Sequence, residues 1–280
     1  MFKIVSKKQI GANIKSFEVE APDIAKNAKA GQFVMFRIDD KGERVPVTVA
    51  VTDKQKGTVT IIAQEMGKST AHLGKLNVGE YIKDFVGPLG HPTEVKNYGT
   101  VVAVAGGVGT AEVFPVIKAL KEAGNKIITI VGARNKDLII LQDEIKASSD
   151  VLLIATDDGS AGKKGFVTDV LKDVMAEETV NMVYAIGPVP MMKAVSNLTK
   201  EKNIKTFVSL NPIMVDGTGM CGACRVSVDG KTRFACVEGP EFEAHKVNWD
   251  ELISRLGVFK ELEKTSFEHF CKCNGTADNR

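Results

Sequence analysis

Three cysteines and one aspartate near the carboxyl end of the chain have the types and spacing of a metal or cluster site. The run Asp216-Gly217-Thr218-Gly219-Met220-Cys221-Gly222-Ala223-Cys224 is followed by Cys236, so the cysteines follow a C-x2-C-x11-C pattern. A cysteine at position 216 would complete the plant-type C-x4-C-x2-C spacing of a [2Fe–2S] cluster, and this chain has aspartate there. Structural zinc with a missing fourth ligand is the alternative. We favour iron and sulfide, and we expect the ligands to be Asp216, Cys221, Cys224 and Cys236.

The fourth ligand is the open part of this assignment. A carboxylate is a harder donor than a thiolate and is unusual on an iron–sulfur cluster. The alternative is that Asp216 and Gly217 form only a turn, with Cys271 or Cys273 as the fourth ligand. We favour Asp216 because it occupies the expected position in the spacing. For Cys271 and Cys273, which are close to a terminus, we expect a free and mobile pair.

A second glycine-rich stretch has the pattern of a phosphate-binding loop. Ala105-Gly106-Gly107-Val108-Gly109-Thr110-Ala111 follows an apolar run typical of a buried strand and opens a helical pattern. Glycines at such a turn let the phosphates of a nucleotide approach the helix N-terminus. A tight strand-to-helix turn without a ligand is the alternative.

Two later segments follow other expected strands, at the sheet edge where ligands of such folds bind. They are residues 156–160, with Asp157 and Asp158, and residues 187–191. An acidic pair would accept hydrogen bonds from a ribose 2′-hydroxyl and repel a 2′-phosphate, so we expect NADH rather than NADPH. A capped turn is the alternative for the pair, and Arg134, just after another strand, could instead serve a 2′-phosphate.

The amino-terminal third contains a third group of candidates. In Arg44-Val45-Pro46-Val47-Thr48, the arginine offers a fork for a phosphate and the threonine a hydroxyl for a ring edge. In Met66-Gly67-Lys68-Ser69-Thr70, backbone amides and hydroxyls could face a pyrophosphate. In isolation, a solvated arginine beside a strand is the simpler interpretation.

The elements that must position these groups fall into three regions, and we expect domains at 1–97, 98–210 and 211–280. The first region predicts a small antiparallel β barrel from short alternating segments: Phe2–Val5, Ile14–Val19, Gln32–Ile38, Val45–Thr52, Thr58–Ala63 and Glu80–Val86. The second predicts a doubly wound parallel α/β domain. Its expected strands are Thr100–Ala105, Lys126–Gly132, Val151–Thr156, Met182–Gly187 and Thr206–Leu210, and its expected helices are Glu112–Ala123, Leu138–Lys146, Val167–Glu177 and Met191–Lys200. The third begins with the glycine- and cysteine-rich loop, and we expect a short hairpin through Cys224–Cys236 and a charged tail.

Composition excludes several other classes of protein. The 280 residues are 44% hydrophobic and carry 37 Lys and Arg against 35 Asp and Glu, so the net charge of +2 gives no basic field for nucleic acid or an anionic membrane. The longest uncharged runs, Asn97–Ala111 and Thr179–Met192, are shorter than the roughly 18 residues of a membrane span. With no secretory signal and an odd number of cysteines, we expect a cytoplasmic protein.

Taken together, the three motif groups and their order resemble the ferredoxin–NADP reductase superfamily over residues 1–250. The order is most similar to the branch with a carboxyl-terminal [2Fe–2S] segment. That branch includes the electron-transfer subunit of dihydroorotate dehydrogenase and the small subunit of NADH-dependent reduced ferredoxin:NADP oxidoreductase, also described as a sulfide dehydrogenase subunit. In this resemblance, three cysteines and one aspartate are associated with the bifurcating oxidoreductase, and four cysteines with the dihydroorotate enzyme.

The resemblance implies a role for each motif residue. The residues that hold FAD, with Thr48 near the reactive N5 edge of the flavin, are Arg44, Pro46, Val47 and Thr48. Those that contact its pyrophosphate are Gly67, Ser69 and Thr70. Those of the nicotinamide-nucleotide loop are Gly106, Gly107, Gly109 and Thr110, and the wall near the nicotinamide is Gly187, Pro188 and Met191. The cluster positions are Asp216, Cys221, Cys224 and Cys236.

The resemblance also implies an activity. A flavoprotein oxidoreductase subunit would exchange hydride between NAD(H) and FAD and single electrons with a [2Fe–2S] cluster, without a catalytic side-chain acid or base. It would work in a heterodimer with a larger flavo-iron–sulfur subunit that binds NADP and exchanges electrons with ferredoxin. The alternatives are the dihydroorotate dehydrogenase subunit and a zinc-containing nucleotide-binding module.

Overall fold

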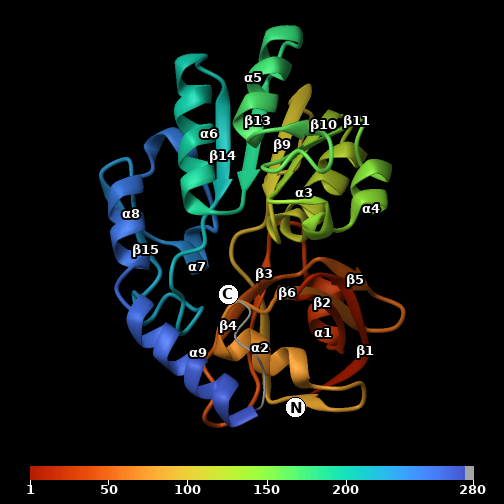
Figure 1. Ribbon diagram of the computed structural model, residues 1–280, viewed down its shortest axis with the longest axis vertical. Helices are drawn as coiled ribbons and strands as arrows, with labels where there is room; N and C mark the ends of the chain where they lie inside the picture. The colour runs from red at the N-terminus through yellow and green to blue at the C-terminus, as the bar shows by residue number, and fades with distance from the viewer. Residues whose placement is uncertain (275–280) are drawn as a thin grey trace.

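The computed structural model describes residues 1–274, and its three parts lie side by side in Figure 1. The antiparallel sheets of the amino-terminal part form one end of the molecule, and the parallel α/β part forms the other. The carboxyl-terminal segment, drawn in blue, runs along one side from the α/β part down to the barrel (Figure 1). This arrangement confirms the predicted combination of barrel, doubly wound domain and carboxyl-terminal segment. No helix among the described residues is long and apolar enough to cross a membrane.

The barrel consists of a five-stranded sheet, β5-β6-β2-β1-β7, and a three-stranded sheet, β4-β3-β8. Its strands are β1 (Phe2–Gly11), β2 (Ile14–Glu20), β3 (Phe33–Arg37), β4 (Val45–Thr48), β5 (Val51–Asp53), β6 (Thr58–Gln64), β7 (Tyr81–Ile82) and β8 (Asp84–Leu89). Two short helices, α1 (Pro22–Asn27) and α2 (Lys68–Lys75), accompany them. The apolar residues that alternate along these strands face one core that includes Phe17, Phe36 and Ile61.

The segment predicted as one strand over Val45–Thr52 is two strands in different sheets. Between β4 and β5, the amide of Val49 donates to Gln32 O (3.1 Å) and that of Ala50 to Thr60 O (3.0 Å). The chain therefore changes hydrogen-bonding partner from β3 to β6 within two residues. The single-strand prediction is wrong here because both halves are apolar, and no sequence signal marks the change of sheet.

The nucleotide part has the strand order β12-β11-β10-β9-β13-β14-β17, in which β9 to β14 pair in parallel. Its strands are β9 (Thr100–Gly106), β10 (Lys126–Ala133), β11 (Val151–Thr156), β12 (Lys163–Lys164), β13 (Met182–Ile186) and β14 (Lys205–Ser209). The order reverses direction between β9 and β13, which makes their carboxyl ends the topological switch point.

The helices of this part are α3 (Gly109–Glu122), η1 (Lys136–Leu138), α4 (Gln142–Ala147), α5 (Val167–Glu177) and α6 (Val189–Glu201). The predicted helix over Leu138–Lys146 is wrong in its first half. Leu141 has a left-handed backbone (φ 54°), and the preceding Ile140 is buried in a cluster with Ile14 and Ile62 of the barrel. Packing between the two parts therefore overrides the helical periodicity.

The carboxyl-terminal segment contains β15 (Arg225–Val228), β16 (Lys231–Phe234), α7 (Ala235–Glu238), β17 (Glu241–Glu243), η2 (Ala244–Lys246), α8 (Trp249–Leu256) and α9 (Lys260–Asn274). The β15–β16 hairpin confirms the predicted one, and its turn residues Asp229 and Gly230 both have positive φ. The expectation of a mobile pair at Cys271 and Cys273 is wrong, because both residues lie in α9, which packs along α2 with the rings of Phe270 and His72 5.8 Å apart. Cys271 is buried in this helix and Cys273 is exposed.

Candidate functional site

The arginine–threonine motif lies on the edge strand of the small barrel sheet. β4 pairs with β3 on one side only, so its side chains are half-buried and Arg44 is exposed. Pro46 is compatible with this position because an edge strand does not need every amide for the sheet. The motif therefore presents Arg44 and Thr48 at an accessible edge.

The Gly67–Thr70 stretch forms the N-terminus of α2, with Gly67 in an extended conformation at the cap. The hydroxyl of Thr70 accepts hydrogen bonds from the amides of Met66 (3.0 Å) and Gly67 (3.2 Å). Ser69 Oγ donates to Glu43 Oε2 (3.3 Å), which joins this helix to the residue before Arg44. The two motifs predicted to hold FAD are therefore neighbours, and the positive end of a helix dipole is available for a pyrophosphate.

The glycine loop lies at the switch point, where β9 ends and α3 begins. A Cβ at position 109 would lie 2.6 Å from the carbonyl oxygen of Ile186, and one at position 106 would lie 2.7 Å from Met191 Sδ. Only glycine allows the loop to approach the end of β13 so closely. By contrast, a Cβ on Gly107 would meet no atom within 4 Å, so the open side of the loop is bare backbone. This cradle suits the phosphates and nicotinamide of a dinucleotide.

The acidic pair follows β11 at the same edge of the sheet. Both carboxylates are exposed, and the amides of Asp157 and Asp158 donate to the carbonyls of Ala133 and Arg134 at the end of β10. Asp158 Oδ1 accepts the amide of Ser160 (2.9 Å), and hydrogen bonds from Ser160 hold the pKa of Asp158 below its ordinary value. Asp158 therefore caps its own turn, and Asp157 and Arg134 lie on adjacent strand ends, where a ribose would bind.

The cysteine loop brings two of its predicted ligands together. Cys224 and Cys236 are buried, and their Sγ atoms are 3.2 Å apart. Burial, together with the hydrogen bond to Cys224, raises the pKa of the Cys236 thiol to about 12. Two buried thiols this close together are suited to binding one shared cationic group, because its positive charge would stabilise their thiolate forms.

The other two predicted ligands are placed differently. Cys221 is exposed, and Asp216 Oδ2 accepts hydrogen bonds from the amide (3.0 Å) and hydroxyl of Thr218. These bonds, with a smaller contribution from nearby Arg44, hold the pKa of Asp216 below its ordinary value. Within residues 1–274, no group of three or more His, Cys, Asp or Glu side chains has the geometry of a metal site. The short distance between the Cys224 and Cys236 sulfur atoms fits two ligands of one cluster. The complete set of four ligands stays a prediction.

The cysteine loop packs directly on the sheet that carries the arginine–threonine motif. A Cβ at Gly217 would lie 2.8 Å from Met35 Cγ on β3 and 3.1 Å from Leu89 Cδ1 on β8. Arg44, next to β4, is close enough to lower the pKa of Asp216. Phe33 and Met35 of β3 share one apolar core with Cys224 and Cys236. The fold thus places the expected cluster segment beside the expected flavin segment.

One titratable side chain near the site, Glu112, is not among the residues predicted from the sequence. Glu112 is in the first turn of α3, directly after the glycine loop, and burial raises its pKa to about 7. The described residues give its half-buried carboxylate no hydrogen-bond or ion-pair partner. The sequence feature that could have indicated Glu112 is an acidic residue among the apolar positions of a helix that follows a nucleotide-binding loop.

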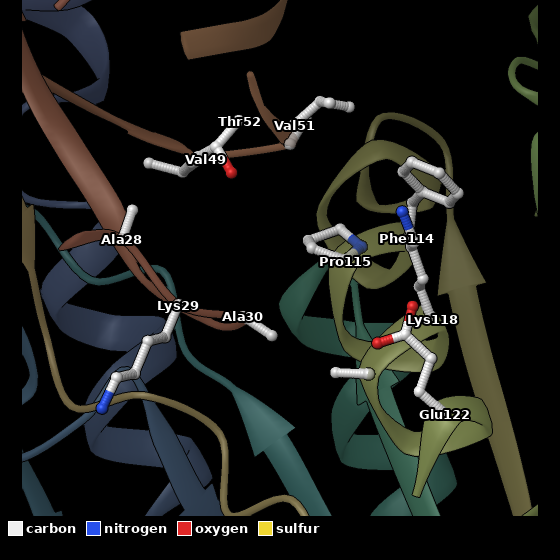
Figure 2. Close-up of a pocket in the computed structure, with 12 residues that line it drawn as sticks. Ala28, Lys29, Ala30, Val49, Val51, Thr52, Phe114, Pro115, Lys118 and Glu122 are labelled. Atoms are coloured by element: carbon white, nitrogen blue, oxygen red, sulfur yellow. The ribbon is translucent and has the colours of Figure 1, made fainter. Parts of the chain in front are cut away.

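Two cavities lie away from these motifs. Figure 2 shows the first, of about 200 Å³, where residues 28–30 and 49–52 of the barrel face Phe114, Pro115 and Lys118 of α3. The second, of about 370 Å³, lies between residues 91–98 and the sheet. Neither of these two cavities is lined by a predicted site residue.

Comparisons with known proteins agree with this geometry. Residues 1–93 match the oxidoreductase FAD-binding domain, residues 103–197 the oxidoreductase NAD-binding domain, and residues 211–248 the iron–sulfur cluster binding domain of dihydroorotate dehydrogenase B. These matches confirm the predicted cofactors, FAD, NAD(H) and an iron–sulfur cluster, and the predicted class of electron-transferring flavoprotein oxidoreductase. They speak against the zinc-containing module.

Individual relatives cover nearly the whole chain. A Thermotoga maritima protein named dihydroorotate dehydrogenase B (NAD(+)), electron transfer subunit homolog is 49% identical over 276 residues, which are 99% of this chain and 98% of that protein. The corresponding subunit of Desulforamulus reducens is 32% identical over 89% of this chain and 97% of its own length. A solved structure described as the NADH-dependent reduced ferredoxin-NADP oxidoreductase, in a study of flavin-based electron bifurcation, has a TM-score of 0.92 and 48% identity over 96% of this chain and 98% of that chain. This chain therefore belongs to the family of dihydroorotate dehydrogenase B electron transfer subunits and their homologues.

Proposed function

We propose that this chain is the electron-transfer subunit of an electron-bifurcating NADH-dependent ferredoxin:NADP oxidoreductase, in which bound FAD and a bound [2Fe–2S] cluster convert the hydride of NADH into single electrons. The observation that carries the proposal is the packing of Gly217 against β3 and β8, the sheet that also contains the arginine–threonine motif. A solved relative of this description has 48% identity to the chain. We retain the domain limits 1–97, 98–210 and 211–280 as part of the proposal.

The proposed role of the barrel residues is to hold and orient FAD. Arg44 supplies a guanidinium for a phosphate, and Pro46 and Val47 form the wall of β4. Thr48 offers its hydroxyl to the ring edge, while the amides at the start of α2, with Gly67, Ser69 and Thr70, receive the pyrophosphate. The internal bonds of Ser69 and Thr70 keep this helix end in place before a ligand arrives.

The proposed role of the nucleotide part is to position the nicotinamide. Gly106, Gly107, Gly109 and Thr110 offer backbone to the phosphates, and Gly187, Pro188 and Met191 form the wall at the switch point. Asp157 selects the unphosphorylated ribose by repelling a 2′-phosphate, and Asp158 shapes the turn that presents it. Alignment of donor and acceptor, rather than a side-chain acid or base, is the protein's contribution to the hydride step.

The proposed partner is a larger flavo-iron–sulfur subunit that passes electrons to or from ferredoxin. Relatives of this chain are named as electron transfer subunits, which implies a second subunit. The proposed setting is the cytoplasm, where thiol ligands stay reduced. Co-purification of the complex from native cells tests this assignment, and a chain that purifies alone with full electron transfer from NADH to ferredoxin contradicts it.

A second candidate is the electron-transfer subunit of dihydroorotate dehydrogenase itself. The family model matched by residues 211–248 belongs to that enzyme, and so do the names of several relatives. The aspartate at 216 favours the first candidate through the resemblance described above. Orotate formation by the native complex, in place of ferredoxin-linked NADP turnover, would reverse the choice.

A separate experiment tests whether Asp216 is a ligand of the cluster. We expect Asp216→Cys to retain a cluster and to change its electron paramagnetic resonance spectrum, because a thiolate replaces a carboxylate on iron. The matched control is Asp229→Cys, in the turn of the adjacent hairpin, which should leave the spectrum unchanged. A D216C spectrum identical to the wild type would remove Asp216 from the ligand set.

A further inference from the structure

A carboxylate lies where the three parts of the molecule meet. Glu241 is the first residue of β17, a short distance along the chain from Cys236, and it is paired with Ser209 of β14. The chain after the last predicted cluster ligand thus becomes the edge strand of the nucleotide sheet at this residue. Glu241 contributes to none of the motifs discussed above.

One oxygen of Glu241 connects segments that are distant in sequence. Its Oε1 accepts hydrogen bonds from Thr93 Oγ1 (2.5 Å), on the segment that leaves the barrel, and from the hydroxyl of Tyr184 (2.7 Å), in the middle of β13. A Cβ at Gly31, in the loop before β3, would lie 2.6 Å from the same oxygen. The barrel, the nucleotide sheet and the cluster segment therefore converge on this single atom.

The backbone just before Glu241 is hydrogen-bonded both to the segment that leaves the barrel and to the nucleotide sheet. The amide of His91 donates to Gly239 O (2.6 Å), and the amide of Leu210 donates to Pro240 O (2.9 Å). Residues 239–241 are therefore bonded to the barrel exit and to the end of β14 at once. Any rotation of the cluster segment against either part must break these bonds.

A cavity borders Glu241, so at this point of the junction the polar contacts add to the apolar core that the cluster segment shares with β3. The carboxylate lines the cavity of about 370 Å³, together with Thr93, Tyr98, Tyr184 and Phe207. Burial raises the pKa of Glu241, while the hydroxyl donors on Thr93 and Tyr184 act in the opposite direction. A half-buried acceptor with two donors is costly to remove, because both donors lose their partner.

We propose that Glu241 is a positioning residue, whose carboxylate fixes the cluster segment against both the barrel and the nucleotide sheet and so sets the separation between flavin and cluster. This inference rests on the proposed function, because the separation matters only if electrons pass between the two groups. The residue acts through the placement of Cys224 and Cys236, and it does not touch a cofactor.

The test uses the full-length, cofactor-loaded chain and the variants Glu241→Ala and Glu241→Gln. Rapid mixing with NADH under anaerobic conditions gives two rates, flavin reduction and cluster reduction. We expect E241A to keep the first rate within about twofold and to lower the second by about tenfold, because small displacements of reacting groups have large kinetic effects. E241Q should restore the second rate, since a glutamine carbonyl accepts both hydroxyl donors.

Amide hydrogen exchange gives a readout that does not depend on turnover. In E241A, the amides of His91 and Leu210 should exchange about tenfold faster, because their acceptors belong to the segment that is released. The control is Glu243→Gln, on the same strand, whose carboxylate pairs with Lys246 (2.8 Å) and not with the junction. E243Q should leave both amides and both rates unchanged.

Two outcomes overturn the proposal: unchanged exchange at His91 and Leu210 in folded E241A, or an equal decrease of both rates. If E241A does not fold, Thr93→Val and Tyr184→Phe each remove one donor and should produce smaller changes of the same kind. Wild-type chain that reduces its flavin but never its cluster contradicts the proposed function. In that case the exchange data still decide whether Glu241 holds the segment.

Discussion

The carboxylate of Glu112 should make the stability of this protein unusually sensitive to pH. It occupies the first turn of α3, burial raises its pKa from the ordinary 4.5 to about 7, and the described residues provide no donor to it. An acid whose pKa is higher in the folded than in the unfolded chain binds more protons when folded. Its favourable contribution is therefore complete below pH 4.5 and is lost as the pH rises through about 7.

Replacing Glu112 with glutamine removes this titration and keeps the side-chain shape. Between about pH 5.5 and about pH 8, the two pKa values correspond to a loss of at most ~2 kcal/mol in the wild type. The side chain is half-buried, so screening by solvent reduces the expected value to ~1 kcal/mol. Glu112→Gln should therefore gain ~1 kcal/mol relative to the wild type across this interval, or ~2–4 °C in melting temperature.

Thermal unfolding of both proteins at the two pH values is the assay. Comparing the difference between variant and wild type at each pH cancels effects that do not depend on ionisation, such as the change in helix propensity on substitution. Glu122→Gln, exposed in the last turn of the same helix, is the control and should give the same difference at both values. A Glu112→Gln difference that does not change with pH would refute the reasoning.

Three other changes test the site. Gly109→Ala places a Cβ 2.6 Å from the Ile186 carbonyl oxygen, so NADH affinity measured by titration should fall by about tenfold or more with FAD content preserved; unchanged affinity would contradict the cradle. Asp157→Ser should narrow the preference for NADH over NADPH in steady-state assays, and an unchanged ratio would remove Asp157 from the ribose site. Cys224→Ser should abolish bound iron and sulfide while FAD remains, whereas Cys273→Ser, in the exposed position on α9, should keep the cluster; equal iron content in the two variants would be inconsistent with the assigned ligands.

Local patterns in the sequence were sufficient to predict most of the fold. The strands and helices of the nucleotide part follow from buried apolar runs that alternate with helical periodicity, as in β9 and α3. The hairpin predicted through Cys224–Cys236 is also present, and both residues of its Asp229-Gly230 turn have positive φ. In each case, the residues that determine the structure are close together in the sequence.

Features set by distant contacts could not be predicted in this way. The split between β4 and β5 depends on hydrogen bonds to Gln32 and Thr60, and the shortened α4 depends on the contact of Ile140 with the barrel. The tail becomes α9 because Phe267 and Cys271 find a surface on which to be buried. The meeting of Glu241, Thr93 and Tyr184 has no counterpart in any local motif.

The candidate site likewise has features that local sequence motifs predict and features that depend on the fold. The glycine loop and the cysteine spacing were visible because each is a continuous motif. The packing of Gly217 on Met35 and Leu89, which brings the cluster segment to the flavin motif, required the fold. Among residues 1–274, the fold alone does not bring Asp216 and Cys221 into one metal site with the Cys224–Cys236 pair. Their roles as ligands therefore require that the bound cluster itself brings the four side chains together.

The central claim is that electrons from NADH reach an iron–sulfur cluster through flavin within this one chain. Anaerobic addition of NADH to the reconstituted, full-length protein, followed by visible absorbance and electron paramagnetic resonance, tests it most directly. The account predicts bleaching of the flavin bands together with a reduced-cluster signal, and predicts that Cys224→Ser loses the second change while keeping the first. Reduced flavin with an unreduced cluster in the wild type, or preparations that contain zinc in place of iron and sulfide, would contradict it.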